Sequence, residues 1–507
     1  AQAIPSLSQA QRIRQMSNNT NLSDTEMNDN KSNHIISVDE KRFDSDNHSE
    51  DYQASSGIHN ISFHIGKGQC AILCGRSGAG KSTVLRLVSG LMPNFYTGEL
   101  SGTVTVNGKY PGVFLPDEKV QTLGVVFQDP RSQFFMGKVL DEIAFSAENI
   151  GMDSVQIIEK VMLCAKQLEI EELLEKNVNE LSSGQKQRVA IAAATVFAPP
   201  VLILDEPVSN LDNNGIKILL KILTEIKEKG TTIIISEHRL HQFLPIADLY
   251  LHIDGGNLQH IWKKSDFKNL QYDDLMNWGI RHPDLVKKKQ KLATSIDELS
   301  KTVEIDHITF KYRKANYGLD NISTLFPSGT VTAILGENGA GKTTFCKILC
   351  GLLKQNSGTV KRDGIALSPS KRRSISYLVM QDADYQIYAD SVGNELVLGK
   401  KITDELKQRA FEALDMFHLT ELKDRHPASL SGGEKQRVTI AAAYCSDADI
   451  IVLDEPTSGM DGEGVLSLAK WVSTLAEKGK TIIIITHDEI LCEIACDNKL
   501  VIGGKKN

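Results

Sequence analysis

Short runs of apolar residues alternate along the chain with longer stretches in which apolar positions recur at helical spacing. The runs at residues 233–235 and 482–485 are unbroken, as in strands of a parallel sheet that is covered on both faces. They are far shorter than the roughly 20 residues that a membrane-spanning helix needs, so we do not expect the chain to cross a bilayer by itself. The alternation predicts an α/β fold in which helices pack on a parallel sheet.

Two glycine-rich segments mark places where a predicted strand gives way to a predicted helix. The first glycine-rich loop reads G-R-S-G-A-G-K-S and starts at Gly75, and the second reads G-E-N-G-A-G-K-T and starts at Gly336. The predicted strand and helix pairs are residues 69–73 with 82–89 and residues 330–335 with 343–350. Such a loop between a strand and a helix is typical of phosphate binding.

Further motifs follow each loop in the same order. The first series reads L-S-S-G-Q, L-I-L-D-E and S-E-H, and the second reads L-S-G-G-E, I-V-L-D-E and T-H. The offset between copies is 249 residues for Ser182/Ser431, Asp205/Asp454, Glu206/Glu455 and His238/His487. A constant offset indicates duplication, so the chain is predicted to contain two copies of one ATP-handling domain.

The chain of 507 residues has room for two or three domains with cores of their own. We predict a leader at residues 1–33, a first domain at 34–254, a linker at 255–300 and a second domain at 301–507. The leader is rich in Ser, Asn, Gln and Asp, which favours disorder. The linker is rich in lysine and has little periodicity, so we interpret it as solvated rather than as a site for an anionic partner.

Composition narrows the classes of function. The net charge of −7 and the pI near 6.1 give no overall basic field, which argues against a nucleic-acid partner. The eight cysteines lack the spacing of zinc ligands, and we expect buried, reduced thiols in a cytosolic protein.

The residue types in the glycine-rich loops suit a nucleoside triphosphate. The glycines let backbone N–H groups turn toward phosphate oxygens, Lys81 and Lys342 neutralise the β- and γ-phosphates, and the hydroxyls of Ser82 and Thr343 can ligate Mg²⁺. The candidate phosphate-binding residues are Gly75, Arg76, Ser77, Gly78, Ala79, Gly80, Lys81, Ser82 and Thr83 in the first loop and Gly336, Glu337, Asn338, Gly339, Ala340, Gly341, Lys342, Thr343 and Thr344 in the second.

Paired acids follow an apolar strand in each copy. Asp205 and Asp454 suit the Mg²⁺ shell, and the adjacent Glu206 and Glu455 can polarise an attacking water. A histidine follows another apolar strand in each copy, and it is predicted to emerge at the same sheet edge near the γ-phosphate. These catalytic candidates are His238 and His487.

The segments L-S-S-G-Q-K-Q-R, which starts at Leu181, and L-S-G-G-E-K-Q-R, which starts at Leu430, resemble the signature of ATP-binding cassette (ABC) ATPases. The resemblance covers about 440 residues and implies two P-loop NTPase domains that bind ATP and Mg²⁺. Each would have a mixed sheet core and a helical subdomain, and the two would pair within the chain about a pseudo-twofold axis. In that family, the signature faces the γ-phosphate held by the opposite domain. The implied signature contacts are Ser182 and Gly184, opposite Lys342, and Ser431 and Gly433, opposite Lys81.

Other residues of this chain also match positions that are typical of the family, with two exceptions. Gln128 and Gln381 match the glutamine that touches Mg²⁺ and senses a membrane partner, and Asp212 and Asp461 match the loop between the two sites. Ser183 stands where the family usually has glycine. Tyr312 matches the aromatic residue that stacks on adenine, but the first domain has F-D-S at residues 43–45 and then an insertion. By spacing, Tyr52 is a candidate substitute there.

The segments after Gln128 and Gln381 resemble those of the ATPases in energy-coupling-factor (ECF) importers, particularly members with both ATPase domains in one chain. This implies a transmembrane coupling subunit, a small substrate-binding membrane protein as further partner, and a peripheral place on the cytoplasmic face of the cell membrane. The chain would not touch the transported molecule, for which the resemblance favours thiamine or a precursor.

Two other classes share these motifs. Soluble twin-cassette ATPases that act on ribosomes usually carry a longer, strongly charged arm between cassettes, whereas residues 255–300 are only mildly basic. DNA-repair ATPases need a long coiled coil between the glycine-rich loop and the signature, but no sustained heptads occur between Lys81 and Ser182. Cofractionation with membranes or with ribosomes discriminates transport from the ribosomal alternative.

Overall fold

The computed structural model describes residues 34–44, 57–96, 98–281, 302–312 and 318–503. We call residues 34–281 the first half and residues 302–503 the second half. Residues Ile35–Asn507 form one unit by their internal contacts. The predicted leader, the lysine run at 287–289 and Tyr52 lie outside the described residues.

The first half is built on a mixed sheet whose central strand leads into the first glycine-rich loop. The strand order is β4-β1-β2-β9-β8-β3-β7-β6-β5. The strands are β1 (His34–Asp44), β2 (Gly57–Gly66), β3 (Cys70–Cys74), β4 (Glu99–Val106), β5 (Leu123–Val126), β6 (Val201–Asp205), β7 (Thr232–Ser236), β8 (Leu249–Asp254) and β9 (Asn257–Lys263). Strand β3 runs parallel to β7 and β8, whereas β1 and β4 are antiparallel. Every residue of β3 is buried, because side chains pack on both faces of the sheet.

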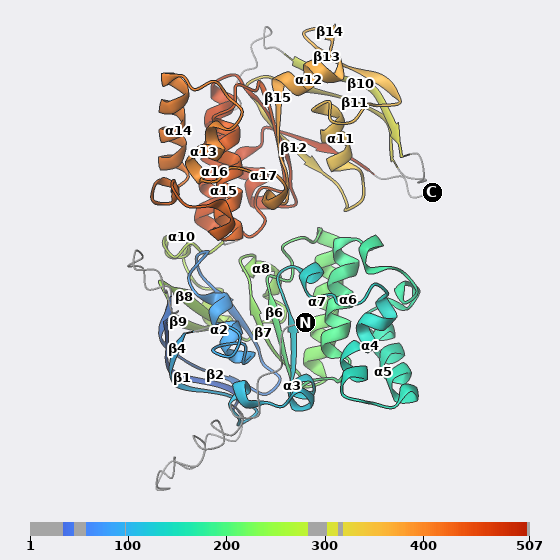
Figure 1. Cartoon of the computed structure of the whole chain (residues 1–507), viewed down its shortest axis with the longest axis vertical. Coiled ribbons are helices and arrows are strands. Elements are labelled where there is room, and N and C mark those ends of the chain that lie inside the picture. Colours follow the sequence, from blue (N-terminus) through green and yellow to red (C-terminus); the bar gives the residue numbers. More distant parts are fainter. Residues whose placement is uncertain (1–33, 45–56, 97, 282–301, 313–317, 504–507) are drawn as a thin grey trace. The chain divides into compact units, whose positions relative to one another are not determined.

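The helices of the first half are α2 (Lys81–Val88), α3 (Pro116–Thr122), α4 (Val139–Asn149), α5 (Ser154–Gln167), α6 (Ser183–Thr195), α7 (Asn213–Glu228), α8 (Leu240–Phe243), α9 (Lys264–Phe267) and α10 (Tyr272–Asn277). Helices α4 to α7 gather on one side of strands β6 and β7, away from β1, β2 and β4, whereas α2 lies beside these three strands (Figure 1). Helix α7 buries Ile216, Leu219, Leu223 and Ile226, which recur at helical spacing. One apolar cluster lies under α2, and a larger one joins α4 to α7 with the sheet.

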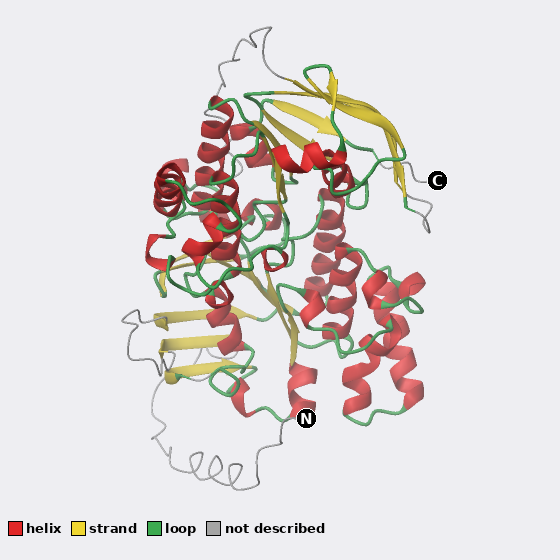
Figure 2. Ribbon diagram, turned by 45° about the horizontal axis from the view of Figure 1, so that its top comes forward, coloured by secondary structure: helices red, strands yellow, loops and turns green. Residues whose placement is uncertain are grey.

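The second half repeats this plan with two separate sheets. An antiparallel sheet has the order β11-β10-β13-β14, and a parallel sheet has the order β15-β16-β17-β12-β18. The strands are β10 (Thr302–Lys311), β11 (Gly318–Pro327), β12 (Val331–Leu335), β13 (Ser357–Arg362), β14 (Ile365–Ala366), β15 (Ser376–Val379), β16 (Ile450–Asp454), β17 (Thr481–Ile485) and β18 (Asn498–Val501). The helices are α11 (Lys342–Leu349), α12 (Pro369–Ile375), α13 (Val392–Val397), α14 (Asp404–Met416), α15 (Gly432–Tyr444), α16 (Gly462–Glu477) and α17 (Glu489–Ala495). Figure 2 shows these helices and strands in separate colours.

The predicted α/β fold class is confirmed in both halves. The two strand and helix pairs around the glycine-rich loops agree with the structure to within one residue at each end. The eight cysteines all lie in the described residues and form no disulfide with one another, and seven of them are buried, in line with the prediction of buried thiols.

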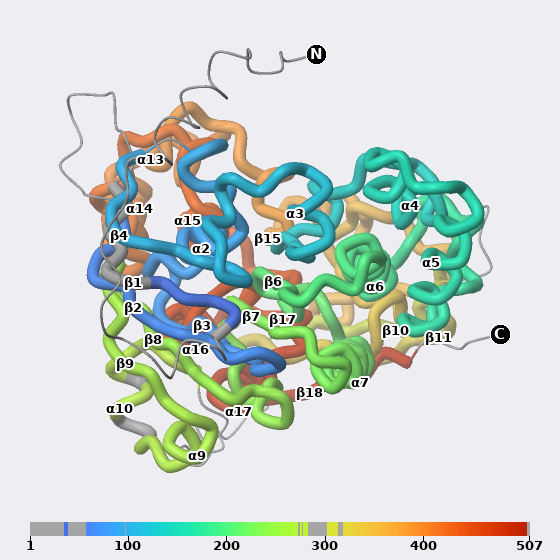
Figure 3. Tube along the Cα trace, turned by 90° about the horizontal axis from the view of Figure 1, so that it is seen from below, coloured from blue at the N-terminus to red at the C-terminus, as the bar shows by residue number. Residues whose placement is uncertain are grey.

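The structure differs from the predicted domain boundary at residue 254. Strand β9 pairs antiparallel with β8, and α9 and α10 follow β9 along the chain and lie near it (Figure 3). Phe267 stacks on Tyr250 with ring centroids 3.9 Å apart, and Leu275 is fully buried. Residues 255–281 therefore belong to the first half. Sequence reasoning missed them because β9, which reads N-L-Q-H-I-W-K, mixes apolar and polar residues instead of showing an apolar run.

Candidate functional site

The first glycine-rich loop wraps around the buried side chain of Lys81. Its Nζ donates to the carbonyl oxygens of Gly75 at 3.1 Å and Arg76 at 2.8 Å, and Lys81 is only 5% exposed. Gly75 has φ 134°, and a Cβ there would lie 1.9 Å from the carbonyl oxygen of Ile253. Helix α2 begins at Lys81 without a side-chain cap or an acid in its first turn. An uncapped helix N-terminus beside a lysine without a bonded carboxylate fits an anion such as a phosphate.

The second loop has the same construction. Lys342 Nζ donates to the carbonyl oxygens of Gly336 at 2.7 Å and Glu337 at 3.1 Å. Helix α11 again begins without a side-chain cap, and its N-cap Gly341 has φ 94°. Burial lowers the pKa of Lys81 and of Lys342, although nearby carboxylates oppose this shift. The phosphates of a nucleotide would favour the charged lysines.

Each half also places a hydroxyl and a carboxylate beside the glycine-rich loop, as a magnesium ion requires. Thr343 Oγ1 donates to Asp454 Oδ2 at 2.8 Å, and Ser82 bonds in the same way to Asp205. Asp205 Oδ1 is buried and has no hydrogen-bond partner. A buried carboxylate oxygen without a hydrogen-bond partner is a suitable ligand for a hard cation such as Mg²⁺. Within the described residues no group of three His, Cys, Asp or Glu side chains forms a metal cluster, so phosphate and water oxygens would complete the shell.

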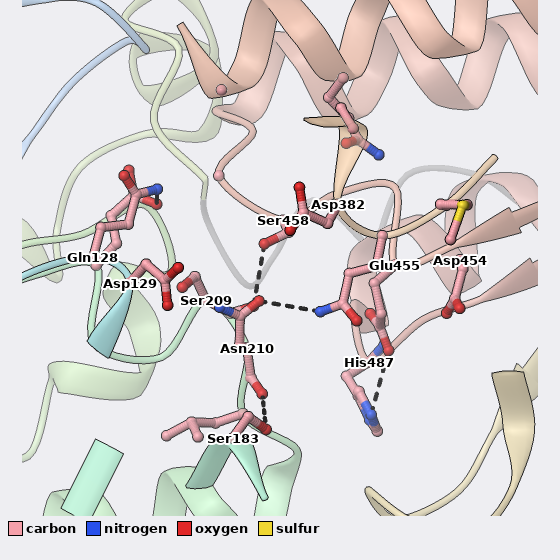
Figure 4. Close-up of a pocket in the computed structure, with 18 of the residues that line it drawn as sticks. Gln128, Asp129, Ser183, Ser209, Asn210, Asp382, Asp454, Glu455, Ser458 and His487 are labelled. Atoms are coloured by element: carbon pink, nitrogen blue, oxygen red, sulfur yellow. Dashed lines mark hydrogen bonds and ion pairs between the residues drawn. The ribbon is translucent and has the colours of Figure 1, made fainter. Parts of the chain in front are cut away.

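The two predicted glutamine ligands face different partners. Gln128 Nε2 donates to Glu206 Oε2 at 2.9 Å, inside its own half. Gln381 Nε2 instead donates to Asn210 Oδ1 of the first half at 3.2 Å, as Figure 4 shows around Asn210. Sequence reasoning did not single out Asn210, because its only signal is its place two residues before Asp212.

The predicted catalytic glutamates share a strained backbone. Glu206 has φ 44° and Glu455 has φ 48°, in the left-handed region that costs a non-glycine residue about 1–2 kcal/mol. Each stays tied to the sheet, because Glu206 N donates to Ser236 O and Glu455 N donates to Ile485 O, both at 2.9 Å. Strain that recurs at both copies is typical of functional positions.

Each glutamate faces the predicted histidine of its own half. His238 Nε2 lies 3.5 Å from Glu206 Oε1, and His487 Nε2 lies 3.4 Å from Glu455 Oε1 (Figure 4). Burial lowers the pKa of His487 to about 4 and that of His238 well below its usual value. Burial raises the pKa of Glu455 to about 7 and also raises that of Glu206. Neutral imidazoles therefore face carboxyl groups whose affinity for protons suits a general base.

The predicted signature segments begin helices with reciprocal caps. Ser182 caps α6 and Ser431 caps α15, and in each case the N3 side chain, Gln185 or Glu434, returns a bond to the cap backbone. This capping box explains why serine and Gln or Glu occur three residues apart in both copies.

Backbone and side-chain contacts pair each glycine-rich loop with the opposite half. Asp461 Oδ2 accepts from Ser77 N at 2.9 Å, and a Cβ at Gly433 would lie 3.4 Å from Ser77 Oγ. We call this junction the first site. In the second site, Asp212 Oδ2 accepts from Asn338 N at 2.8 Å, and Asn338 Nδ2 lies 3.4 Å from Ser183 Oγ.

A cavity of about 1090 Å³ spans both sites. Its lining includes residues of both glycine-rich loops, Gln128 and Gln381, the predicted catalytic glutamates and histidines of both halves, Asp454, Tyr312, Ser431 and Gly433. Ser182, Gly184 and Asp205 are described but do not line it; Ser183 does so in place of its neighbours. Tyr312 OH bonds to Thr344 Oγ1 at 3.1 Å, and the Phe310 ring meets its ring edge-on at 4.8 Å.

Helices in the described part of the chain are all too short or too polar to span a membrane.

Comparisons with known proteins give one consistent family. The profile of the family described as ABC transporter matches residues 58–209 and 319–458. A protein of Treponema denticola, provisionally named ABC transporter ATP-binding protein, is 38% identical over 89% of this chain and 93% of its own length. A Bacillus subtilis protein provisionally named HMP/thiamine import ATP-binding protein YkoD is 31% identical over 88% of this chain and 86% of its own length.

A solved structure is similar along most of the chain. It is the archaeal ribosome recycling factor aABCE1 in complex with the ribosomal stalk protein aP1, with 25% identity and a TM-score of 0.62. The match covers 88% of this chain and 86% of that one.

Proposed function

Because the chain belongs to the ABC transporter family, we propose that it is the ATP-hydrolysing subunit of an ECF-type importer of a vitamin or similar micronutrient. Its two ABC domains imply ATP binding and hydrolysis. The importer assignment is supported by the likeness to the protein named for HMP/thiamine import, which extends over 88% of the chain.

Under this proposal the two sites share one set of roles. The glycine-rich loops hold the phosphates, and the glutamates activate water beside the histidines. Mg²⁺, when bound, would neutralise charge on the phosphates. The proposed magnesium ligands are Ser82, Asp205 and Gln128 in the first site and Thr343, Asp454 and Gln381 in the second. ATP binding favours the closed arrangement of the halves, and hydrolysis lets them separate. ATP that bound both arrangements with equal affinity would not shift the equilibrium between them.

One structural observation supports the proposal of a membrane protein as partner. Phe135 and Tyr388 occupy equivalent positions after Gln128 and Gln381, and they are 76% and 78% exposed. A buried glutamate fixes the turn beneath each ring. Glu142 accepts from the amide of Phe135 at 2.9 Å, and Glu395 accepts from that of Tyr388 at the same distance. A rigid turn that presents an exposed aromatic ring in both halves is suited to a protein partner.

Copurification tests this surface. We expect the wild-type chain to copurify with integral membrane proteins from detergent-solubilised membranes. We expect Phe135→Ala with Tyr388→Ala to lose them while the ATPase activity of the isolated chain is kept. The matched control is Phe411→Ala on α14, which removes another ring that is 66% exposed and should keep the complex. Retention of the membrane proteins by the double variant would contradict the proposed surface.

The likeness to the archaeal ribosome recycling factor favours a second candidate, an ATPase that acts on the ribosome. This candidate predicts that the chain sediments with ribosomes when ATP is present and that nuclease treatment releases it. Sedimentation with membranes after the same nuclease treatment supports the importer and a place on the cytoplasmic face. Nuclease-sensitive sedimentation with ribosomes alone would reject it.

A further inference from the structure

Arg281 belongs to the first half, but its side chain is enclosed by the second. It lies beyond α10 and its side chain is only 2% exposed. Nη1 donates to Asp488 Oδ2 at 2.7 Å, and Asp488 is buried to a similar extent. Nη2 donates to the carbonyl oxygens of Thr457, at 3.1 Å, and Met460. A buried guanidinium with these partners fixes their relative positions, because its loss would leave the desolvated Asp488 carboxylate without this charged donor.

The two groups that Arg281 joins serve different sites. Thr457 and Met460 belong to the loop that ends at Asp461, whose carboxylate accepts from Ser77 N in the first site. Asp488 directly follows His487. The His487 ring lies 3.1 Å from Lys342 Nζ and 3.4 Å from Glu455 in the second site. One side chain therefore bridges a contact of the first site and the histidine of the second.

The backbone before Arg281 is tied to both halves. Gly279 O accepts from Gly462 N of the second half at 3.0 Å. Asn277 O accepts from Arg76 Nη2 of the first glycine-rich loop at 2.9 Å. A Cβ at Gly279, which has φ 67°, would lie 2.7 Å from Arg76 Cγ, so glycine permits the close approach. Residues 277–281 form what we call the wedge.

The wedge makes the two repeats unequal. At the offset of 249 residues, Asp488 of the second half corresponds to Arg239 of the first, so the first half lacks the carboxylate. The loop that corresponds to Thr457–Met460 is 208–211. Its Asn210 carbonyl accepts from Ser183 Oγ and Asn338 Nδ2, and across the described residues no arginine bonds to it. The duplication therefore does not account for Arg281.

We propose that Arg281 is a positioning residue that couples the two ATP sites, by holding the loop before Asp461 and the segment of His487 in one fixed arrangement. Nucleotide that orders the first site then favours the placement of His487 in the second, and the reverse follows by linkage. The inference rests on the proposed ATP sites but not on the identity of the partner, whether membrane protein or ribosome.

The test compares Arg281→Met with a matched buried arginine. Arg372 is fully buried in the second half, where Nη1 donates to Ile348 O and Nη2 to Gln355 Oε1. Arg372→Met therefore removes a similar side chain without touching the junction of the halves. We expect a Hill coefficient for ATP hydrolysis above 1 in the wild type and in Arg372→Met, and about 1 in Arg281→Met.

A second measurement isolates the second site. In a Glu206→Gln background, hydrolysis at the first site is blocked and nucleotide stays bound there. We expect addition of Arg281→Met to raise the KM of the second site at least about fivefold. Asp488→Asn keeps the size of the side chain and the Oδ1 atom that caps α17. It should raise the KM of the second site to the same extent, and it replaces Arg281→Met in this test if that variant does not fold.

Arg281→Lys keeps a charge for Asp488 but cannot reach both carbonyls with a planar fork, and we expect an intermediate Hill coefficient. A wild-type Hill coefficient of 1, or equal coefficients in the wild type and the Asp488→Asn and Arg281→Lys variants, would overturn the coupling role. Full hydrolysis after Glu206→Gln with Glu455→Gln would instead reject the ATP sites themselves, so the two failures are distinguishable.

Discussion

The carboxylate of Asp461 makes two hydrogen bonds whose contributions can be separated by experiment. Oδ2 accepts from Ser77 N across the junction of the halves at 2.9 Å, and Oδ1 accepts from Gly464 N at the start of α16 at 2.8 Å. Replacement by alanine removes both. The helix cap contributes about 1 kcal/mol to the stability of the second half. The bond across the junction is charge-assisted and contributes about 1.5–3 kcal/mol.

Asp461 is only partly buried, so we use the lower limit of about 1.5 kcal/mol, which corresponds to a roughly tenfold loss in the equilibrium for closure. The assay uses chains that also carry Glu206→Gln and Glu455→Gln, in which closed, ATP-bound protein is expected to accumulate. Asp461→Ala should raise the ATP concentration that half-saturates trapping about tenfold.

The control is Asp153→Ala, which removes only a helix cap. Asp153 Oδ2 accepts from Val155 N at 3.0 Å at the start of α5. Both substitutions should lower the unfolding temperature without nucleotide, but only Asp461→Ala should weaken trapping. Equal half-saturating ATP concentrations for the two variants would refute the assignment of a closure bond to Asp461 and Ser77.

Three further outcomes are expected. Glu206→Gln together with Glu455→Gln should abolish turnover while ATP still binds, and appreciable steady-state hydrolysis would exclude both as catalytic bases. Ser431→Arg should reduce nucleotide occupancy of the first site more than that of the second, which photolabelling followed by peptide mapping measures; the opposite order would reject the crossed pairing. Burial would raise the pKa of Asp488, but the Arg281 guanidinium outweighs it and holds this pKa below its usual value. This stabilisation is fully present above about pH 3.9 and is lost as the pH falls through the lower folded pKa. As the pH is lowered from 5 to 3, the unfolding free energy should therefore fall more steeply in the wild type than in Asp488→Asn.

Sequence motifs located most of the candidate sites, because the chemistry of phosphate binding restricts residue types at fixed spacing. The glycine-rich loops, the paired acids and the histidines all come to the cavity or its immediate surroundings. Motif spacing alone did not show which of two neighbouring serines lines the cavity. Ser183 lines it, whereas Ser182 caps helix α6. The strained φ of Glu206 and Glu455 has no signal in the sequence, because backbone geometry depends on the sheet that holds each residue.

The sequence by itself determined the duplication, the α/β class and the strand-to-helix turns at Lys81 and Lys342. These follow from local periodicity and from repeated motifs, which act within a few residues. Only the tertiary structure assigned residues 255–281 to the first half and brought Arg281 to Asp488, because that contact joins residues 207 positions apart. Local sequence carries no record of such a pair, since its free energy depends on burial that the packing of the two halves creates.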